Sequence, residues 1–223
     1  MRDASRVPLD ATSPHHAVTR RRGDGWYTKT YRYRHDVARV AFSTRLDALS
    51  RLSTQLSTLP QMAWTMDPSG ITVRQRIVSR GALVCTIEDA LETLASDLDV
   101  MHAEGHVHGD LNRKNVIETP AGFRMVDIEP LLEIPCEFGY RLRTTPPYLH
   151  EDDRISGRIS AKSDRLGFGC LAMWRIGAVR SPAQAASSLH SLARHHTAAT
   201  MMVRLYRSID RSTEFDLTPI RSA

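Results

Sequence analysis

Apolar and polar residues follow patterns that change near residue 80, which divides the chain into two parts of different texture. Bulky and polar residues alternate over residues 26–34, and this period of two predicts a strand. Over residues 36–57 the apolar side chains recur every three to five positions, which predicts an amphipathic helix. Two further alternating runs, at residues 62–66 and 71–78, flank a Pro/Gly turn and predict a hairpin.

The second part begins with a helix, which is predicted over residues 87–104. Acidic residues crowd its first turn, apolar residues form one stripe along it, and Gly105 is placed to end it. Three short strands are predicted after this helix, at residues 107–110, 115–118 and 123–128. From residue 164 onward the pattern is mainly helical. We therefore expect an α+β protein, with a β-rich unit over residues 23–80 and a mainly helical unit over residues 81–223.

Composition narrows the class of protein. Of the 223 residues, 41% are hydrophobic and 25% are charged, as in soluble globular domains, which excludes a disordered chain or a coiled-coil rod. No window of about 18 apolar residues is present, so we expect no membrane span. Residues 1–22 are rich in Ser, Pro, His and Arg and lack an apolar signal segment, so we expect a mobile stretch there and no Sec-type secretion.

The three cysteines, Cys85, Cys136 and Cys170, lie far apart in the chain. They form neither a disulfide framework nor a paired metal motif. We expect them to be small buried side chains in a reducing compartment, which indicates a cytoplasmic protein.

Charge is distributed unevenly, with a net charge of +8 over residues 1–87 and −3 over residues 88–223. The basic residues are scattered and are not interleaved with aromatic side chains, so we do not expect nucleic-acid binding. Lysine occurs only at Lys29, Lys114 and Lys162, so any role that requires a lysine has few candidates.

The residues that carry chemistry lie between the predicted helix and the last predicted strand. Asp110 and Asn115 lie five residues apart on a loop, and Asp127 ends a strand 17 residues after Asp110. Phosphoryl transfer needs a carboxylate that orients the attacking hydroxyl or accepts its proton. It also needs a carboxylate and an amide oxygen that hold Mg²⁺ on the nucleotide phosphates.

This run resembles the protein-kinase-like superfamily. His108-Gly109-Asp110 matches its H-R-D or H-G-D motif, Asn115 its catalytic-loop Asn, and Asp127-Ile128-Glu129 its D-F-G. Residues 145–151 and 162–174 resemble two further segments of the protein-kinase branch. The resemblance implies a bilobal protein-kinase-like fold, with a small β-rich N-lobe that carries one helix and a trimmed, mainly helical C-lobe.

The resemblance also implies roles for individual residues. Asp110 would be the base or orienting carboxylate, and Asn115 and Asp127 would bind the Mg²⁺ or Mn²⁺ of bound ATP. Lys29 would bind the α- and β-phosphates, and Lys114 would neutralise the transferred phosphoryl group. Asp164 would hold the catalytic loop through its backbone, and His108 would be a packed residue that hydrogen-bonds backbone near Asp127.

Other positions depart from the pattern of the family. The family pairs this lysine with a glutamate on the N-lobe helix, but no glutamate precedes Glu88 in this sequence. The partner expected for Lys29 is therefore Asp47, or else Asp36. No G-x-G-x-x-G occurs; residues 19–25, with three arginines, could cover the phosphates instead. Glu129 replaces the D-F-G glycine, and it either adds a carboxylate to the metal site or points to solvent. Because Gly109 replaces the H-R-D arginine, we expect no dependence on activation-loop phosphorylation.

The function that the resemblance implies is a Ser/Thr protein kinase, with ATP as the phosphoryl donor and a protein as the acceptor. The alternatives are a small-molecule kinase of the aminoglycoside type and a nucleotide-binding pseudokinase. Small size and the missing glycine loop resemble the minimal bacterial kinases that type III systems inject into host cells. We accordingly expect a monomer that is cytoplasmic or secreted into a host cell, where its substrate would be a host protein.

Overall fold

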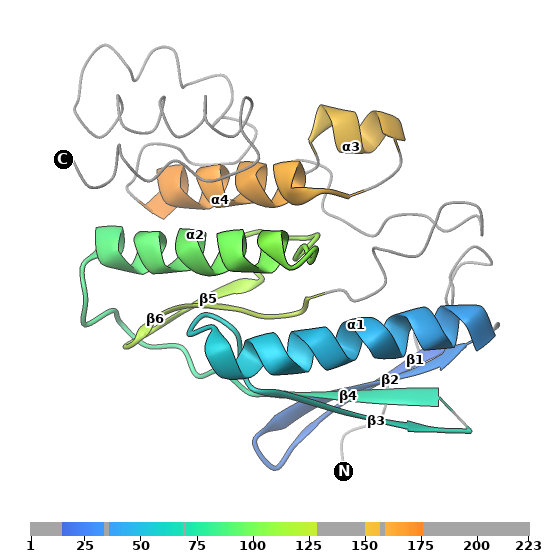
Figure 1. The fold of residues 1–223 in the computed structure, drawn as a ribbon. Coiled ribbons are helices and arrows are strands. Elements are labelled where there is room, and N and C mark those ends of the chain that lie inside the picture. The colour runs from blue at the N-terminus through green and yellow to red at the C-terminus, as the bar shows by residue number, and fades with distance from the viewer. Residues whose placement is uncertain (1–14, 34–35, 69, 129–149, 157–158, 176–223) are drawn as a thin grey trace.

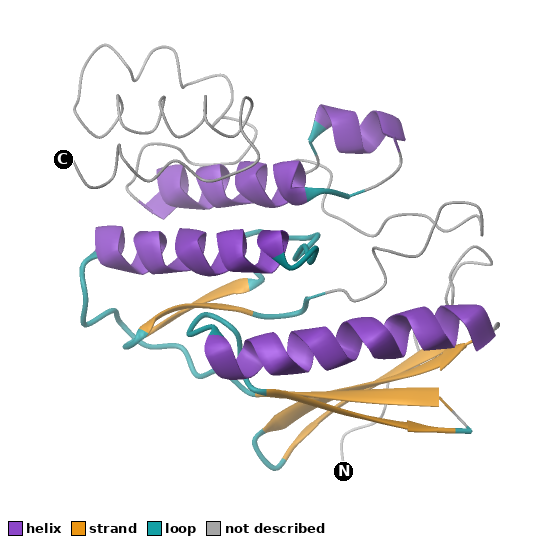
Figure 2. Cartoon of the chain, viewed as in Figure 1, coloured by secondary structure: helices purple, strands orange, loops and turns teal. Residues whose placement is uncertain are grey.

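The computed structural model describes residues 15–33, 36–68, 70–128, 150–156 and 159–175 (Figure 1). Its first five elements are β1 (His15–Gly23), β2 (Trp26–Tyr33), α1 (Asp36–Gln55), β3 (Met62–Asp67) and β4 (Gly70–Arg76). The next five are α2 (Ile87–Ala103), β5 (Val116–Thr119), β6 (Gly122–Met125), α3 (Glu151–Ser156) and α4 (Ala161–Arg175). The predicted α+β class is confirmed, and helices and strands occupy separate layers in Figure 2. The arrangement is compatible with a small two-lobed fold.

Strands β1 to β4 form an antiparallel sheet in the order β1-β2-β4-β3, and α1 covers one of its faces (Figure 1). Successive side chains of the two central strands, β2 and β4, lie on opposite faces of the sheet. Tyr31, Ile71 and Val73 are buried. On the other face, the guanidinium groups of Arg74 and Arg76 lie 4.8 Å and 5.5 Å from the centre of the Trp26 ring. The period-two pattern therefore reports a sheet with one buried face.

The structure corrects the expected boundary between residues 1–22 and the β-rich unit from residue 23. Strand β1 begins at His15 and pairs with β2 as far as Gly23 opposite Trp26. Its residues are mostly polar, so no apolar alternation marks it. Backbone hydrogen bonds to β2 order the strand, and composition alone does not reveal them.

Helix α2 begins and ends as its sequence predicts. The side chain of Thr86 accepts a hydrogen bond from the backbone N–H of Asp89, which caps the first turn. At the other end, the N–H of Gly105 bonds to the carbonyl of His102, and the N–H of His106 bonds to that of Met101. This is a Schellman ending, which stops the helix directly before the loop that carries Asp110. Residues 107–110, predicted as a strand, belong to that loop.

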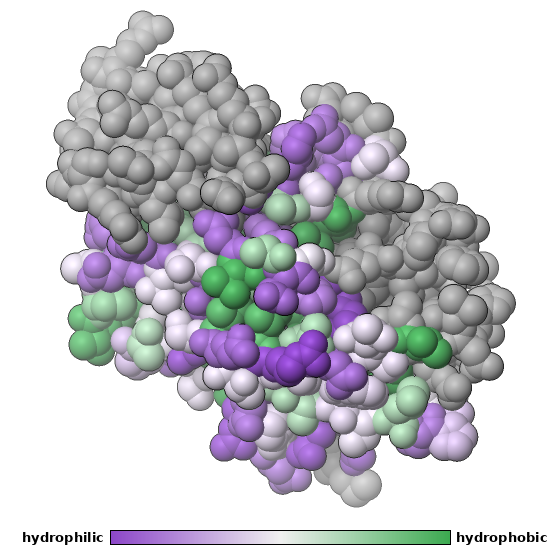
Figure 3. All heavy atoms as spheres, in the orientation of Figure 1, coloured by the Kyte–Doolittle hydropathy of each residue, from purple (hydrophilic) through white to green (hydrophobic). Residues whose placement is uncertain are grey.

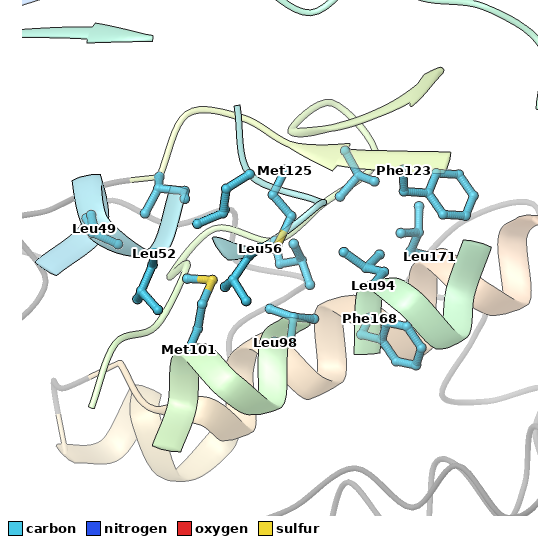
Figure 4. Packing of buried hydrophobic residues seen from close by; sticks show 14 of the residues in the cluster. Leu49, Leu52, Leu56, Leu94, Leu98, Met101, Phe123, Met125, Phe168 and Leu171 are labelled. Carbon is cyan, nitrogen blue, oxygen red and sulfur yellow. The ribbon is translucent and has the colours of Figure 1, made fainter. Parts of the chain in front are cut away.

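One apolar core joins the two parts of the chain (Figure 4). It combines residues of α1, α2, β6, α4 and the turn after α1, among them Leu49, Leu52, Leu56, Leu94, Leu98, Met101, Phe123, Met125, Phe168 and Leu171. The stripe predicted along α2 lies at its centre. Because α2 packs against β6 on one side and α4 on another, the loop between α2 and β5 is fixed at both ends.

On the face shown in Figure 3, polar residues cover much of the coloured surface, and apolar residues form a central patch and smaller patches nearer the edges. Cys170 is buried as expected, but Cys85 is exposed, because it lies in the connection before α2 rather than in a packed element. Cys136 lies outside the described residues. None of the helices that the structure describes is both long and apolar enough to cross a membrane.

Candidate active site

The backbone of the loop between α2 and β5 is held by the side chain of Asp164, in the first turn of α4. One carboxylate oxygen accepts the backbone N–H of His108 at 2.6 Å and lies 3.0 Å from Nε2 of His102. The other accepts the N–H of Gly109 at 2.8 Å. The predicted hydrogen bonds from Asp164 to the loop backbone are therefore confirmed.

The Asp164 side chain is fully buried, yet its environment keeps it ionised. Burial on its own raises the pKa of this carboxyl group. The hydrogen bond and electrostatic attraction of His102, together with the N–H of Gly109, outweigh burial, so the pKa lies below its ordinary value. The positive end of the α4 dipole lies beside this residue and favours the same form.

His108 is also fully buried and acts as a packed bridge, as predicted. Its Nε2 donates to the carbonyl of Val126 at 3.1 Å, and its Nδ1 accepts the N–H of Asp110 at 3.3 Å. The two bonds together require the neutral imidazole with its proton on Nε2. Burial lowers the pKa of His108, although nearby carboxylates oppose this, so the neutral form is favoured. His108 thus connects the loop to the strand that ends before Asp127.

Asp110 and Asn115 are in direct contact. The side-chain nitrogen of Asn115 donates to the Asp110 carboxylate at 3.0 Å and to its backbone carbonyl at 2.9 Å. Asn112, which is buried, donates to the same carbonyl at 2.9 Å and accepts the backbone N–H of Lys114 at 2.9 Å. Asn112 is therefore a further site residue that sequence reasoning missed. Lys114 itself is exposed.

The β5–β6 hairpin brings Asp127 beside Asn115, although 12 positions separate them in the chain. The N–H of Val126 donates to the carbonyl of Asn115 at 2.7 Å, one residue before Asp127. Asp127 has a φ of 62°, in the left-handed region that costs a side chain other than glycine roughly 1–2 kcal/mol. The predicted grouping of Asp110, Asn115 and Asp127 on one loop-and-hairpin unit is confirmed.

Lys29 lies on β2 and is buried, and its ammonium group forms an ion pair with the Asp127 carboxylate. The lysine of the first part of the chain thus meets the carboxylate of the second. The same ammonium group lies 5.9 Å from the centre of the Tyr27 ring.

The structure does not support Asp47 as the partner of Lys29. Asp47 is exposed, and no ion pair joins it to Lys29 among the described residues. Asp47 follows the buried Leu46 by one position, which turns its side chain about 100° around the helix axis and away from the buried face. The side chain of Asp36 and all of Glu129 lie outside the described residues.

The side chain that α1 directs toward the loop is Arg45. It is buried, and its guanidinium group donates to the carbonyl of Val107 at 2.8 Å and to Nδ1 of His106 at 3.1 Å. The sequence carries a signal for this residue, because Arg45 interrupts the apolar stripe between Phe42 and Leu49. Sequence reasoning missed it by searching the helix for an acidic residue.

A pocket lies between the sheet and the end of β6, next to the ion pair of Lys29 and Asp127. Its lining residues are Tyr27, Lys29, Tyr31, Val73, Gln75 and Ile128. Aromatic and apolar side chains form most of its wall, and Lys29 supplies a cation at its edge. Its lining therefore combines aromatic surface with the cation of Lys29.

The donor set fits a magnesium ion shared with a ligand. Among the described residues, no three His, Cys, Asp or Glu side chains meet as they would in a metal site built by protein alone. Asp127 and Asn115 offer a carboxylate and an amide oxygen, and Mg²⁺ ordinarily takes one or two carboxylates and completes its shell with water and phosphate oxygens.

No protein-family model matches the chain, and none of the curated proteins matches it significantly.

Proposed function

We propose that the chain is an ATP-dependent phosphotransferase with a bilobal protein-kinase-like fold. In this proposal β1–β4 and α1 form the N-lobe, and the elements from α2 onward form the C-lobe. The observation that carries it is a pair of contacts that the β5–β6 hairpin brings together next to the pocket: the Lys29–Asp127 ion pair and the Asp110–Asn115 hydrogen bond. Those four residue types are the set that phosphoryl transfer requires.

The reaction assigns each group a step. Asp110 orients the acceptor hydroxyl and accepts its proton as the oxygen attacks the γ-phosphorus atom. The new oxygen–phosphorus bond forms while the bond to the β–γ bridging oxygen breaks, and ADP leaves. Asp127 and Asn115 would hold Mg²⁺, which would supply positive charge to the phosphates. Lys29 holds the α- and β-phosphates, and the exposed Lys114 is placed to meet the transferred group.

The ion pair between Lys29 and Asp127 is the resting arrangement of the proposed site. Both groups have stronger partners in a bound nucleotide, because the ammonium group pairs with phosphate oxygens and the carboxylate with the metal ion. Binding of Mg·ATP then exchanges one ion pair for two. Neither the Lys29 ammonium group nor the Asp127 carboxylate is then left without a counter-charge.

The acceptor we propose is a Ser or Thr hydroxyl of a protein. This choice rests on the resemblance of residues 145–151 and 162–174 to protein-kinase segments. Part of the first segment lies outside the described residues, whereas the second coincides with α4. A cytoplasmic enzyme, or an effector that acts on a host protein after type III secretion, is part of the same proposal.

The test is incubation with γ-labelled ATP and Mg²⁺ or Mn²⁺, alone and with a cell lysate. Asp110→Asn and Asp127→Asn should each lower protein labelling by at least about 100-fold. Asp152→Asn, the same change at an exposed carboxylate on α3, should label like the unaltered chain. Label on metabolites rather than proteins would indicate a small-molecule kinase. Nucleotide binding without turnover would indicate a pseudokinase, and both results would contradict the proposed activity.

A further inference from the structure

The pocket beside Lys29 contains a buried side-chain amide that the proposed mechanism does not use. Gln75 lies on β4, is 8% exposed and lines this pocket. It pairs with Tyr27 in the sheet register, two residues before the pair of Lys29 with Val73 on β2. Gln75 and Lys29 therefore share a face of the sheet and lie on neighbouring strands.

The Gln75 amide has no hydrogen-bond partner among the residues that the structure describes, although other buried polar side chains around the site do. Asn112 and His108, for example, each make two hydrogen bonds. An amide that is more than nine-tenths buried favours a polar partner, since leaving it unsatisfied is unfavourable. Gln75 is not among the described residues whose polar side-chain atoms are fully buried without a partner. Its amide therefore keeps some accessible surface, and the pocket that Gln75 lines is the space next to it.

The position of Gln75 selects which part of a nucleotide it meets. Lys29 marks the phosphates, because they are the anionic part. Gln75 is opposite Tyr27, two residues or roughly 7 Å along the strand from Lys29, so it lies farther along the pocket than the group that binds the phosphates. The Tyr27 ring at that point offers an aromatic face, and such a face stacks on a base.

We infer that Gln75 binds the purine base of the nucleotide through its side-chain amide, a step that rests on the proposed function. Its oxygen accepts from the exocyclic amino group of adenine, and its nitrogen donates to a neighbouring ring nitrogen. A glutamine amide is suited to this pair because it carries one acceptor and two donors on a planar group. In this proposal the Gln75 side chain distinguishes adenine from other bases.

The experiment compares two probes, Mg·ATP and magnesium tripolyphosphate, by isothermal titration calorimetry. Gln75→Met keeps the length of the side chain and removes both hydrogen bonds. We expect about a tenfold loss of ATP affinity, consistent with two neutral hydrogen bonds, and no change for tripolyphosphate, which has no base. Gln55→Met, the same substitution at an exposed glutamine at the end of α1, should bind both probes like the unaltered chain.

The two levels of the proposal fail separately. Equal ATP affinity of Gln75→Met and the unaltered chain would overturn the role of Gln75 and leave the kinase proposal standing. Equal losses for ATP and tripolyphosphate would also overturn it, since they would show a general disturbance of the pocket. Failure of the unaltered chain to bind either probe would overturn both. Should Gln75→Met not fold, as judged by its melting curve, Gln75→Leu also removes both hydrogen bonds without adding a charge, and the same comparison applies.

Discussion

Replacing Asp164 by asparagine tests how the catalytic loop is held. The carboxylate accepts hydrogen bonds from the N–H groups of His108 and Gly109 on different oxygens, and it lies 3.0 Å from His102. An asparagine has one oxygen and one NH₂ group, so in either orientation the NH₂ group faces a backbone N–H. At least one buried donor is left without an acceptor, and the remaining bonds lose their ionic character.

The magnitude follows from the count of bonds. A buried unsatisfied donor costs roughly 1–3 kcal/mol, and hydrogen bonds to a charged group contribute about 1.5–3 kcal/mol each. Because these losses overlap, we expect Asp164→Asn to lower the free energy of unfolding by about 3–5 kcal/mol, the range typical of breaking a buried ionic contact. Since whole domains are stable by only about 5–15 kcal/mol, the effect should be large.

The assay is equilibrium unfolding in urea followed by tryptophan fluorescence, with the free-energy change taken from the shift in midpoint at a common slope. Asp152→Asn is the matched control, because Asp152 is exposed and its ion pair with Lys162 lies at the surface. We expect no measurable change for the control. A loss below about 1 kcal/mol for Asp164→Asn would refute the reasoning, because a loop held by that carboxylate could not tolerate the change.

Three further predictions concern other parts of the same framework. Because burial lowers the pKa of His108 below 6.5, the unfolded chain binds the His108 proton more readily than the folded chain. The free energy of unfolding should therefore fall by up to about 1.4 kcal/mol per pH unit as the pH drops below 6.5. His108→Gln should flatten this pH dependence when the free energy is measured by urea unfolding. A Cβ atom at Gly167 would lie 2.2 Å from the carbonyl oxygen of Leu111, so Gly167→Ala should cost roughly 1–3 kcal/mol in the same assay, and a variant as stable as the parent would contradict the close packing of α4 on the loop. Burial raises the pKa of the Cys170 thiol to about 12, whereas Cys85 is exposed; peptide mapping after maleimide treatment should find Cys85 modified in the folded protein and Cys170 only after unfolding.

The elements that the sequence predicted well are those that bury an apolar face. The stripe of α2 and the alternation of β3 and β4 both report burial, and both elements lie where the pattern placed them. The position of Asp164 in the first turn of α4 was also predicted, because residues 162–174 resemble a protein-kinase segment. Strand β1 was missed because its residues are mostly polar and show no apolar alternation, although its backbone pairs with β2.

The candidate site shows a second limit. Spacing placed Asp110, Asn115 and Asp127 correctly, because a short loop and a hairpin leave few ways to arrange them. It failed for α1, where the rotation of one residue decides whether a side chain faces the site. Asp47 has suitable chemistry and faces solvent, whereas Arg45 was overlooked and is buried against the loop.

The position of β1 at the edge of the described sheet has a consequence for association between molecules. An edge strand offers unpaired backbone groups to any second strand that approaches it, including a strand of another copy of this chain. Here that edge carries three consecutive arginines, Arg20, Arg21 and Arg22, the last two of which are exposed. Two such edges repel each other as they approach, so the residues that make β1 hard to recognise also oppose edge-to-edge pairing between the sheets of two copies.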